Sequence, residues 1–260
     1  MLKPNAVKAQ LAVGGEAFGL FCSLPMPQIV EMIGCAGYDF VILDTEHALV
    51  DPEKLENLVR AAEAVGLTPF VRVPEGDPGA VLRALDAGAL GIVVPHVRSA
   101  SDAAAAVRAA RYHPEGERSL NGGRPAGFGA IPPEEYIRRA NAEVMVVALV
   151  EDADGVAAID EILAVPGVDM VMPGPGDLSQ SYGVPWQVRH PAVLDAVARL
   201  ADACSAAGIP FCPIARSAES IERWRAAGVR AFSLGEDRDL AAGALRAQRR
   251  IAEAAPAGLN

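Results

Sequence analysis

The sequence predicts an α/β fold, a single (β/α)₈ TIM barrel that occupies residues 1–260 as one domain. The length suits one such barrel and allows a sizeable core. Short apolar runs alternate with alanine-rich stretches from one end of the chain to the other. Several of these stretches close on a glycine that introduces the next apolar run, as at a left-handed helix cap. No domain boundary and no internal repeat interrupts this alternation.

Eight apolar runs have the length expected of core strands. Most are hydrophobic almost throughout, as in a parallel sheet that is covered on both faces. An open, doubly wound sheet is the weaker alternative, because no G-x-G-x-x-G pattern follows the first run. The expected strands are 18–23, 40–44, 68–73, 91–95, 144–151, 168–172, 209–213 and 231–234.

The stretches between these strands carry helical patterns. In residues 52–65, four apolar residues recur at the spacing of one helix face, beginning with Leu55 and Leu58. One long irregular segment, 112–131, is rich in glycine, proline and arginine, which is typical of a functional loop after a barrel strand. Glycine caps before strands are expected at Gly37, Gly66, within 88–91, and at Gly167, Gly208 and Gly228.

The composition indicates which binding partners and which cellular compartment to expect. The 33 acidic and 23 basic residues give a net charge of −10 without a basic stripe, so nucleic acid and membrane surfaces are unexpected partners. No apolar run reaches the roughly 18 residues that span a bilayer, and the first residues lack a secretion signal, so we expect a cytoplasmic protein. The four cysteines have no C-x-x-C spacing and are expected to be reduced and buried.

Polar side chains mark five of the expected strands at their carboxyl ends, where (β/α)₈ barrels place their active sites. They are D-T-E-H at 44–47, Arg72, His96, the pair Glu151-Asp152, and P-G-P-G-D at 173–177. Each has a purely structural explanation by itself: a carboxylate near a helix start, a structural histidine, an ion pair at the rim, or a tight turn. Their convergence on one end of a barrel favours a functional site.

Glu151 and Asp177 form a candidate pair of ligands for a hard divalent cation. Two carboxylates with water suit Mg²⁺ or Mn²⁺, and a bound 2-oxoacid would supply two more oxygens. The three lysines are Lys3, Lys8 and Lys54, and no expected strand carries one. A Schiff-base lysine inside the barrel is therefore excluded, so an enolate formed here would need a metal as its electron sink.

Together these motifs resemble the HpcH/HpaI aldolase family, which includes 4-hydroxy-2-oxoheptanedioate aldolase and 2-dehydro-3-deoxyglucarate aldolase. The resemblance implies a barrel of the phosphoenolpyruvate/pyruvate type and a class II aldolase that uses Mg²⁺, or else Mn²⁺ or Co²⁺. Such an enzyme cleaves 4-hydroxy-2-oxoacids to pyruvate or hydroxypyruvate and an aldehyde. The motifs occur in family order and are G-Y-D-F-V-I-L-D-T-E-H (37–47), V-R-V-P (71–74), L-D-A-G-A (85–89), the strand ending in Glu151, and G-V-D-M-V-M-P-G-P-G-D-L-S (167–179).

The resemblance implies a catalytic role for three residues. His47 would be the general base that takes the methyl proton of pyruvate, directly or through water. Asp86, in L-D-A-G-A, would pair with His47 and keep the imidazole basic. Arg72 would hold the keto oxygen that becomes the enolate oxyanion.

The resemblance also implies the binding groups. Glu151 and Asp177 would bind the metal, and the backbone N–H groups of Gly176 and Asp177 would hold the substrate carboxylate. Asp44 and Glu46 would orient His47 or a metal-bound water.

One position departs from the family pattern. The better-known aldolases carry a glutamine two residues before the metal-binding glutamate, where it helps to bind the 2-oxoacid, and this chain has Leu149. Strand alternation places Leu149 and Glu151 on the same inward face, so we expect Leu149 to line the substrate site. The implied substrate-binding amide is absent, so the donor need not be plain pyruvate.

Other functions on the same barrel remain open. A citrate-lyase-like or malyl-CoA-lyase-like enzyme is disfavoured because such chains tend to be longer and need basic residues for coenzyme A. A hydrolase or decarboxylase of 2-oxoacids, and a binding protein that has lost its activity, are further alternatives.

The sequence says less about the aldehyde acceptor and the oligomeric state than about the donor site. We expect the loop 112–131, through Arg118 and Arg124, and residues after the seventh strand to select an aldehyde with an anionic tail. The resemblance implies a homohexamer, a trimer of dimers, with C-terminal helices exchanged between neighbours. The alanine-rich stretch near 239–254 is the part of the sequence that fits such a helix.

Overall fold

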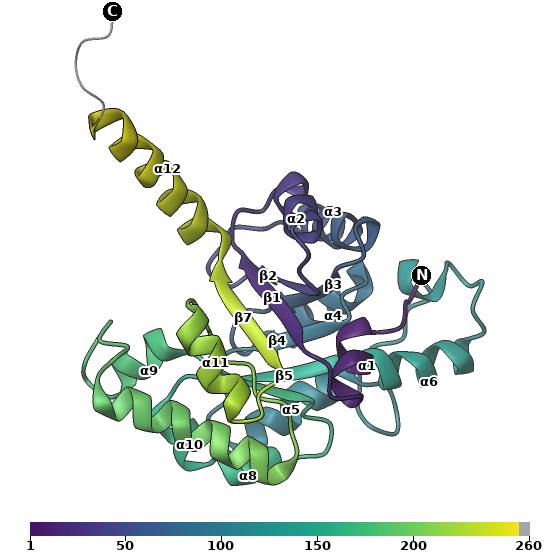
Figure 1. The fold of residues 1–260 in the computed structure, drawn as a ribbon. Coiled ribbons are helices and arrows are strands. Elements are labelled where there is room, and N and C mark those ends of the chain that lie inside the picture. Colours follow the sequence, from purple (N-terminus) through teal and green to yellow (C-terminus); the bar gives the residue numbers. More distant parts are fainter. Residues whose placement is uncertain (255–260) are drawn as a thin grey trace, which may run out of the picture.

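The computed structural model describes residues 1–254, in which seven parallel strands form one curled sheet (Figure 1). Their order is β6-β5-β4-β3-β2-β1-β7, so the chain winds once around the sheet and returns beside its first strand. The strands are β1 (Ala17–Cys22), β2 (Phe40–Asp44), β3 (Thr68–Arg72), β4 (Gly91–Val94), β5 (Met145–Val150), β6 (Met170–Pro173) and β7 (Ala231–Glu236). The predicted α/β barrel class is confirmed.

An irregular segment stands where the sequence predicts a regular strand at 209–213. Pro210 and Pro213 have no N–H to give to a ladder, so this segment forms only isolated bridges. On one side Cys212 N–H donates to the carbonyl of Val171 in β6 at 2.8 Å. On the other side the N–H of Ser233 in β7 donates to the carbonyl of Pro213 at 3.0 Å. The prediction of a regular strand here is wrong, yet the segment links β6 to β7 at the eighth position of the ring.

Most of the helices follow the strands and pack on the outside of the sheet (Figure 1). The predicted helix over 52–65 is confirmed as α3 (Pro52–Ala64), which begins with a cap in which Asp51 accepts from the N–H of Lys54. The other helices are α1 (Ala6–Ala12), α2 (Pro27–Cys35), α4 (Pro78–Ala87), α5 (Ala100–Ala110), α6 (Pro133–Glu143), α7 (Ala153–Ala157), α8 (Ile159–Leu163), α9 (Pro175–Ser181), α10 (Pro191–Ala207), α11 (Ala218–Ala226) and α12 (Asp237–Ala254), with the 3₁₀ turn η1 (Arg124–Ala126).

The glycines predicted at helix ends have the backbone that only glycine adopts freely. Gly88 after α4 has φ 110° and Gly208 after α10 has φ 69°, both in the left-handed region. The other four predicted caps, Gly37, Gly66, Gly167 and Gly228, also have positive φ. Each cap turns the chain sharply from a helix toward the next strand, so these predictions are confirmed.

Two apolar layers hold the barrel together. One fills the interior of the sheet and includes Phe40, Phe70 and Leu149, and the other lies between the sheet and the helices. Glycine makes room for the interior aromatic rings, since a methyl group on Gly19 would lie 2.0 Å from the ring of Phe40. The inward position predicted for Leu149 is confirmed.

Helix α12 extends away from the barrel at its carboxyl end (Figure 1). In the described part of the chain, no helix is both long and apolar enough to cross a lipid bilayer. The last six residues of the predicted domain, 255–260, lie outside the described residues.

Candidate active site

The carboxyl ends of β2 and β3 hold a buried ion pair. The parallel register pairs Asp44 with Arg72, so their side chains lie next to each other. Nε and Nη2 of Arg72 donate to the two carboxylate oxygens of Asp44 at 3.0 and 2.9 Å. Burial alone would raise the pKa of Asp44, but the hydrogen bonds and charge of Arg72 outweigh it, and the pKa is lowered. With Phe21 packed against its face, the Arg72 guanidinium is fixed in place.

Glu46 and His47 form the next turn. The backbone N–H groups of both residues donate to Oδ1 of Asp44 at 3.1 and 3.2 Å, so Asp44 orders the turn that carries the imidazole. Oε2 of Glu46 lies 3.4 Å from Nη1 of Arg72 and 3.8 Å from Nε2 of His47. The His47 side chain is 57% exposed and is therefore accessible to a substrate. These contacts support the expectation that Asp44 and Glu46 orient His47.

Glu151 is a deeply buried carboxylate, with 3% of the residue exposed. The backbone N–H of His96 donates to its Oε1 at 3.1 Å, and His96 has φ 53°, which is uncommon for a residue with a side chain. Nδ1 of His96 lies 2.9 Å from Oδ2 of Asp152, which holds the ring. Burial raises the pKa of Glu151 to about 7, and the Asp177 and Glu46 carboxylates add to the rise against the effect of His96. A cation in front of Glu151 would oppose this rise.

The glycine-rich turn at 173–177 leads from β6 into α9 and places Asp177 beside the same cavity as Glu151. A methyl group on Gly174 would lie 2.2 Å from Oε2 of Glu151. Glycine is therefore required at this point because the carboxylate fills the space of a side chain.

These groups surround one cavity of about 220 Å³ at the carboxyl ends of the strands. Its lining includes the imidazole, the Arg72 guanidinium, the two carboxylates and the apolar wall that the sequence predicts for handling an enolate. Six of the nine predicted site residues line it, namely His47, Arg72, Leu149, Glu151, Gly176 and Asp177, whereas Asp44, Glu46 and Asp86 do not.

The cavity has further lining residues that the sequence reasoning missed. Arg216 follows the irregular segment at 209–213, where residues that select the aldehyde are expected, but it was not singled out; Glu236 and Arg238, which end or follow β7, were not expected. The rule that strand ends carry the site would have found Glu236 and Arg238 had it been applied to the last expected strand. Trp186 is also missed, because it lies in the connection between α9 and α10 and no periodic pattern marks it.

Asp86, the predicted partner of His47, does not line this cavity. Its carboxylate accepts hydrogen bonds from Nη2 of Arg118 and from Nδ2 of Asn121, both at 2.9 Å. No hydrogen bond or ion pair joins Asp86 to His47 among the described residues. The predicted pair is therefore not formed within one chain, because Arg118, which is buried, holds Asp86 against its own loop.

The two arginines expected to bind the aldehyde are also occupied. Arg118 is bound to Asp86, and Arg124 forms an ion pair with Glu63 and donates to the carbonyl of Ala87 at 2.9 Å. Neither of them lines the cavity within this chain. The expectation that Arg118 and Arg124 bind an anionic tail of the aldehyde is therefore corrected for the site within one chain.

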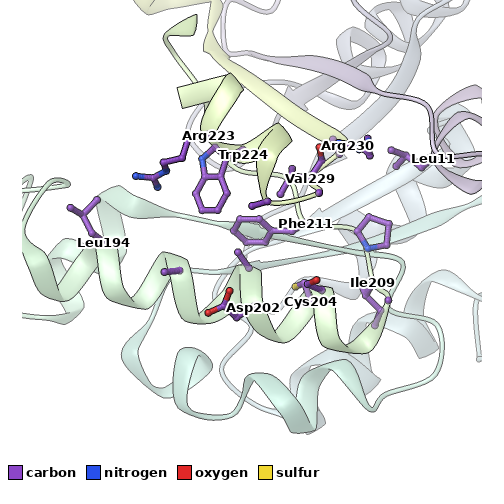
Figure 2. Close-up of a pocket in the computed structure, with 18 of the residues that line it drawn as sticks. Leu11, Leu194, Asp202, Cys204, Ile209, Phe211, Arg223, Trp224, Val229 and Arg230 are labelled. Carbon is purple, nitrogen blue, oxygen red and sulfur yellow. Dashed lines mark hydrogen bonds between the residues drawn. The ribbon is translucent and has the colours of Figure 1, made fainter. Parts of the chain in front are cut away.

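A larger hollow of about 640 Å³ lies between α10 and α11 (Figure 2). Phe211 and Trp224 lie next to each other in it (Figure 2). Their ring centroids are 5.5 Å apart, and the ring planes are tilted by 59°. Its lining includes Ile209 and Arg230, which lead into the sheet, and none of the predicted site residues. The smaller cavity at the strand ends, where the polar groups converge, is therefore the candidate active site.

Comparison with known proteins decides the family. The model of the family described as HpcH/HpaI aldolase/citrate lyase matches residues 17–244. This chain belongs to that family. The resemblance inferred from the motifs is thereby confirmed.

Several relatives of this HpcH/HpaI family member are similar over nearly their whole length. A hydroxypyruvate/pyruvate aldolase of Paraburkholderia phytofirmans is 36% identical over 240 residues, covering 90% of this chain and 92% of the relative. The structure of an HpcH/HpaI aldolase from Desulfitobacterium hafniense is 30% identical with a TM-score of 0.93, covering 99% and 100% of the two chains. The structure of the citrate synthase SbnG is 40% identical with a TM-score of 0.89, covering 95% and 97%.

The side chains at the site of this family member offer ligands that fit a hard divalent cation. Within residues 1–254, no group of three or more His, Cys, Asp or Glu side chains is arranged to hold a metal. Glu151 and Asp177 supply two carboxylates beside a cavity that has room for water and a small acid. Mg²⁺ is commonly bound by one or two carboxylates while it keeps several waters, so this pair suits it.

Proposed function

We propose that this protein is a class II aldolase that makes and breaks the bond between a pyruvate-like donor and an aldehyde. The single observation that carries the proposal is the grouping of His47, Arg72, Glu151 and Asp177 around one small cavity. Relatives named as aldolases support it. The chain's lysines lie at positions 3, 8 and 54, and none lines this cavity, so an imine mechanism has no nucleophile.

The residues divide the chemistry between them. In the direction of condensation, His47 takes a proton from the carbon beside the keto group of the donor. The resulting enolate carbon attacks the aldehyde carbonyl, and the former aldehyde oxygen receives a proton to become the hydroxyl group. Nε and Nη2 of Arg72 hold Asp44, and Nη1 lies 3.4 Å from Oε2 of Glu46, so we assign the second N–H of Nη1 to the oxygen that carries the enolate charge.

A divalent cation held by Glu151 and Asp177 would supply Lewis-acid stabilisation of the same charge. Mg²⁺ is the ion that we expect, with Mn²⁺ and Co²⁺ as substitutes. The backbone N–H groups of Gly176 and Asp177 would orient the donor carboxylate.

Asp86 acts on His47 only if it comes from a neighbouring subunit. Within one chain Asp86 is held by Arg118, and His47 is largely exposed. A homo-oligomer reconciles the implied dyad with this geometry, and the hexamer implied by the resemblance would place the site between subunits. Exposed Leu240, Leu245 and Ile251 on the projecting helix α12 give such an assembly apolar surface to bury. We place this assembly in the cytoplasm.

The donor is proposed to be hydroxypyruvate as well as pyruvate. Leu149 presents an apolar wall beside Glu151 instead of an amide, so the site lacks one hydrogen bond that would distinguish between donors. The relative named hydroxypyruvate/pyruvate aldolase is consistent with this choice.

A panel of donors and acceptors tests the proposed function. Purified enzyme is offered pyruvate or hydroxypyruvate with several aldehydes, with and without Mg²⁺, Mn²⁺ and Co²⁺, and the 4-hydroxy-2-oxoacid product is measured. We expect product with both donors only when a cation is added. No product with any pair would overturn the aldolase proposal.

A second candidate is a condensation that uses an acyl thioester. The 40% identity to the citrate synthase SbnG favours it. Against it, Arg216 and Arg238 at the cavity mouth are each paired with an acidic residue, and a coenzyme A ester needs cations for its phosphates. Release of free thiol from acetyl-coenzyme A in the presence of oxaloacetate would support this alternative.

A further inference from the structure

Trp186 has a combination of backbone and exposure that packing does not explain. Its φ is 64°, a left-handed conformation that is unfavourable for a bulky side chain. The residue is also 84% exposed, so its indole gains little from burial within the chain. Backbone strain of this kind persists where the surroundings enforce it and clusters at ligand sites.

The surroundings that enforce it belong to the glycine-rich turn of the candidate site. The N–H of Trp186 donates to Oγ of Ser179 at 2.8 Å, and the hydroxyl of Ser179, which is buried, donates to the carbonyl of Gly176. A methyl group on Gly176 would lie 3.6 Å from the indole ring. Trp186 is therefore tied to the same turn that carries Asp177.

The indole forms part of the wall of the 220 Å³ cavity, together with apolar Pro175 and Ile214. Two further arginines at the same cavity, Arg216 and Arg238, each have an acidic neighbour. Nη2 of Arg216 lies 3.6 Å from Oδ2 of Asp239, and Nη2 of Arg238 lies 2.6 Å from Oε1 of Glu236. Among residues 1–254, the apolar surface of Trp186, Pro175 and Ile214 is the part of this wall that takes part in no ion pair.

We propose that Trp186 forms the apolar wall of the acceptor subsite and that the preferred aldehydes carry an apolar ring, aromatic or alicyclic. The inference rests on the proposed aldolase function and adds the class of its second substrate. The donor occupies the inner end of the cavity against Arg72 and Glu151. The aldehyde then approaches from the outer end, and burying the indole against its ring favours binding.

The first test is a ratio of kcat/KM values for benzaldehyde and glycolaldehyde, measured in the Mg²⁺-loaded enzyme with one donor. Glycine adopts φ 64° without strain, so Trp186→Gly removes the indole without cost to the backbone. We expect this variant to lower the benzaldehyde-to-glycolaldehyde ratio about tenfold, and Trp186→Phe to keep most of it. The control is Val13→Gly, because Val13 is also 84% exposed, does not line the cavity and lies outside the loop 112–131.

The second test reads binding without catalysis. The chain has two tryptophans, and Trp224 is 7% exposed, so acrylamide quenching reports mainly on Trp186. The Mg²⁺-loaded enzyme is filled with oxamate, a pyruvate analogue without a methyl group, and titrated with cyclohexanecarbaldehyde. We expect protection from quenching and a blue shift of emission, both lost in Trp186→Phe.

The outcomes separate the two proposals. Aldol activity with an unchanged acceptor ratio in Trp186→Gly, or a Trp186 that is shielded from acrylamide before any aldehyde is added, would overturn the acceptor wall alone. No aldol product and no donor proton exchange with any substrate would instead overturn the proposed function.

Discussion

At the scale of single residues, Glu151 carries the clearest electrostatic signal. Its carboxylate is buried beside Asp177 and Glu46, and the pKa rises to about 7. The sequence could predict that Glu151 faces the site, because strand alternation and the end of β5 fix its position. It could not predict the degree of burial, which depends on Gly174 and on the left-handed backbone of His96.

The raised pKa of Glu151 predicts how the metal-free enzyme responds to pH. The folded state holds the proton more tightly than the unfolded state, so stability from this group is greatest below pH 4.5 and is lost as pH rises toward about 7. In chelator at pH 8, Glu151→Gln should therefore melt several degrees above wild type, with about 2–4 °C expected for each kcal/mol. Differential scanning fluorimetry should show the gap closing toward pH 5. A gap independent of pH would contradict this account.

The position of Leu149 leads to a prediction about the choice of donor substrate. Leu149→Gln adds an amide beside Glu151, and one hydrogen bond gained should shift the ratio of kcat/KM values toward pyruvate over hydroxypyruvate by about 1–2 kcal/mol. Both donors are measured with one aldehyde in wild type and variant. An unchanged ratio would mean that water already replaces the amide and would remove Leu149 from donor selection.

At the scale of elements, the strands and caps follow from local patterns, and the exceptions have local causes. Seven of the eight expected strands are present, because continuous apolar runs between glycine caps suit a covered parallel sheet. The segment 209–213 deviates because its two prolines break the ladder. The partners of Asp86 could not be predicted, because Arg118 and Asn121 lie in an irregular loop without periodicity.

The turn from β6 into α9 gives a prediction about metal binding. In Gly174→Ala the added methyl group would lie 2.2 Å from Oε2 of Glu151 and must push the carboxylate aside. We expect metal affinity, measured by calorimetry, to fall at least tenfold, because the ligand geometry is lost. Gly243→Ala is the control, since nothing lies within 4 Å of the added methyl group. Equal affinity in both variants would show that Glu151 does not bind the metal.

At the scale of the whole molecule, the described residues assemble most of the predicted site, but they give His47 only a 3.8 Å contact with Glu46. Sequence resemblance supplied the expected pair of His47 and Asp86, and the structure separates them within one chain. A pair of His47 and Asp86 is compatible with this geometry only if the two residues come from different subunits. The sequence contains no local pattern from which such sharing could be read.

Mixing inactive subunits tests whether sites are shared. His47→Ala should lose about 10²–10⁴ in rate, as expected on removal of a general base, and Asp86→Ala should also be impaired. Unfolding and refolding the two variants together should restore activity in about a quarter of the sites, where an intact His47 meets an intact Asp86 from another chain. Activity no higher than the average of the separate variants would place the two residues in independent roles.

The central claim is that a divalent cation and His47 together generate an enolate from a pyruvate-like donor in the cavity of Glu151 and Asp177. Exchange of the pyruvate methyl protons with D₂O, followed by NMR without any aldehyde, measures this step alone. We predict exchange with Mg²⁺, loss of exchange in excess EDTA, recovery on adding Mg²⁺ or Mn²⁺, and near-complete loss in His47→Ala. Exchange at the full rate in excess chelator would contradict the account.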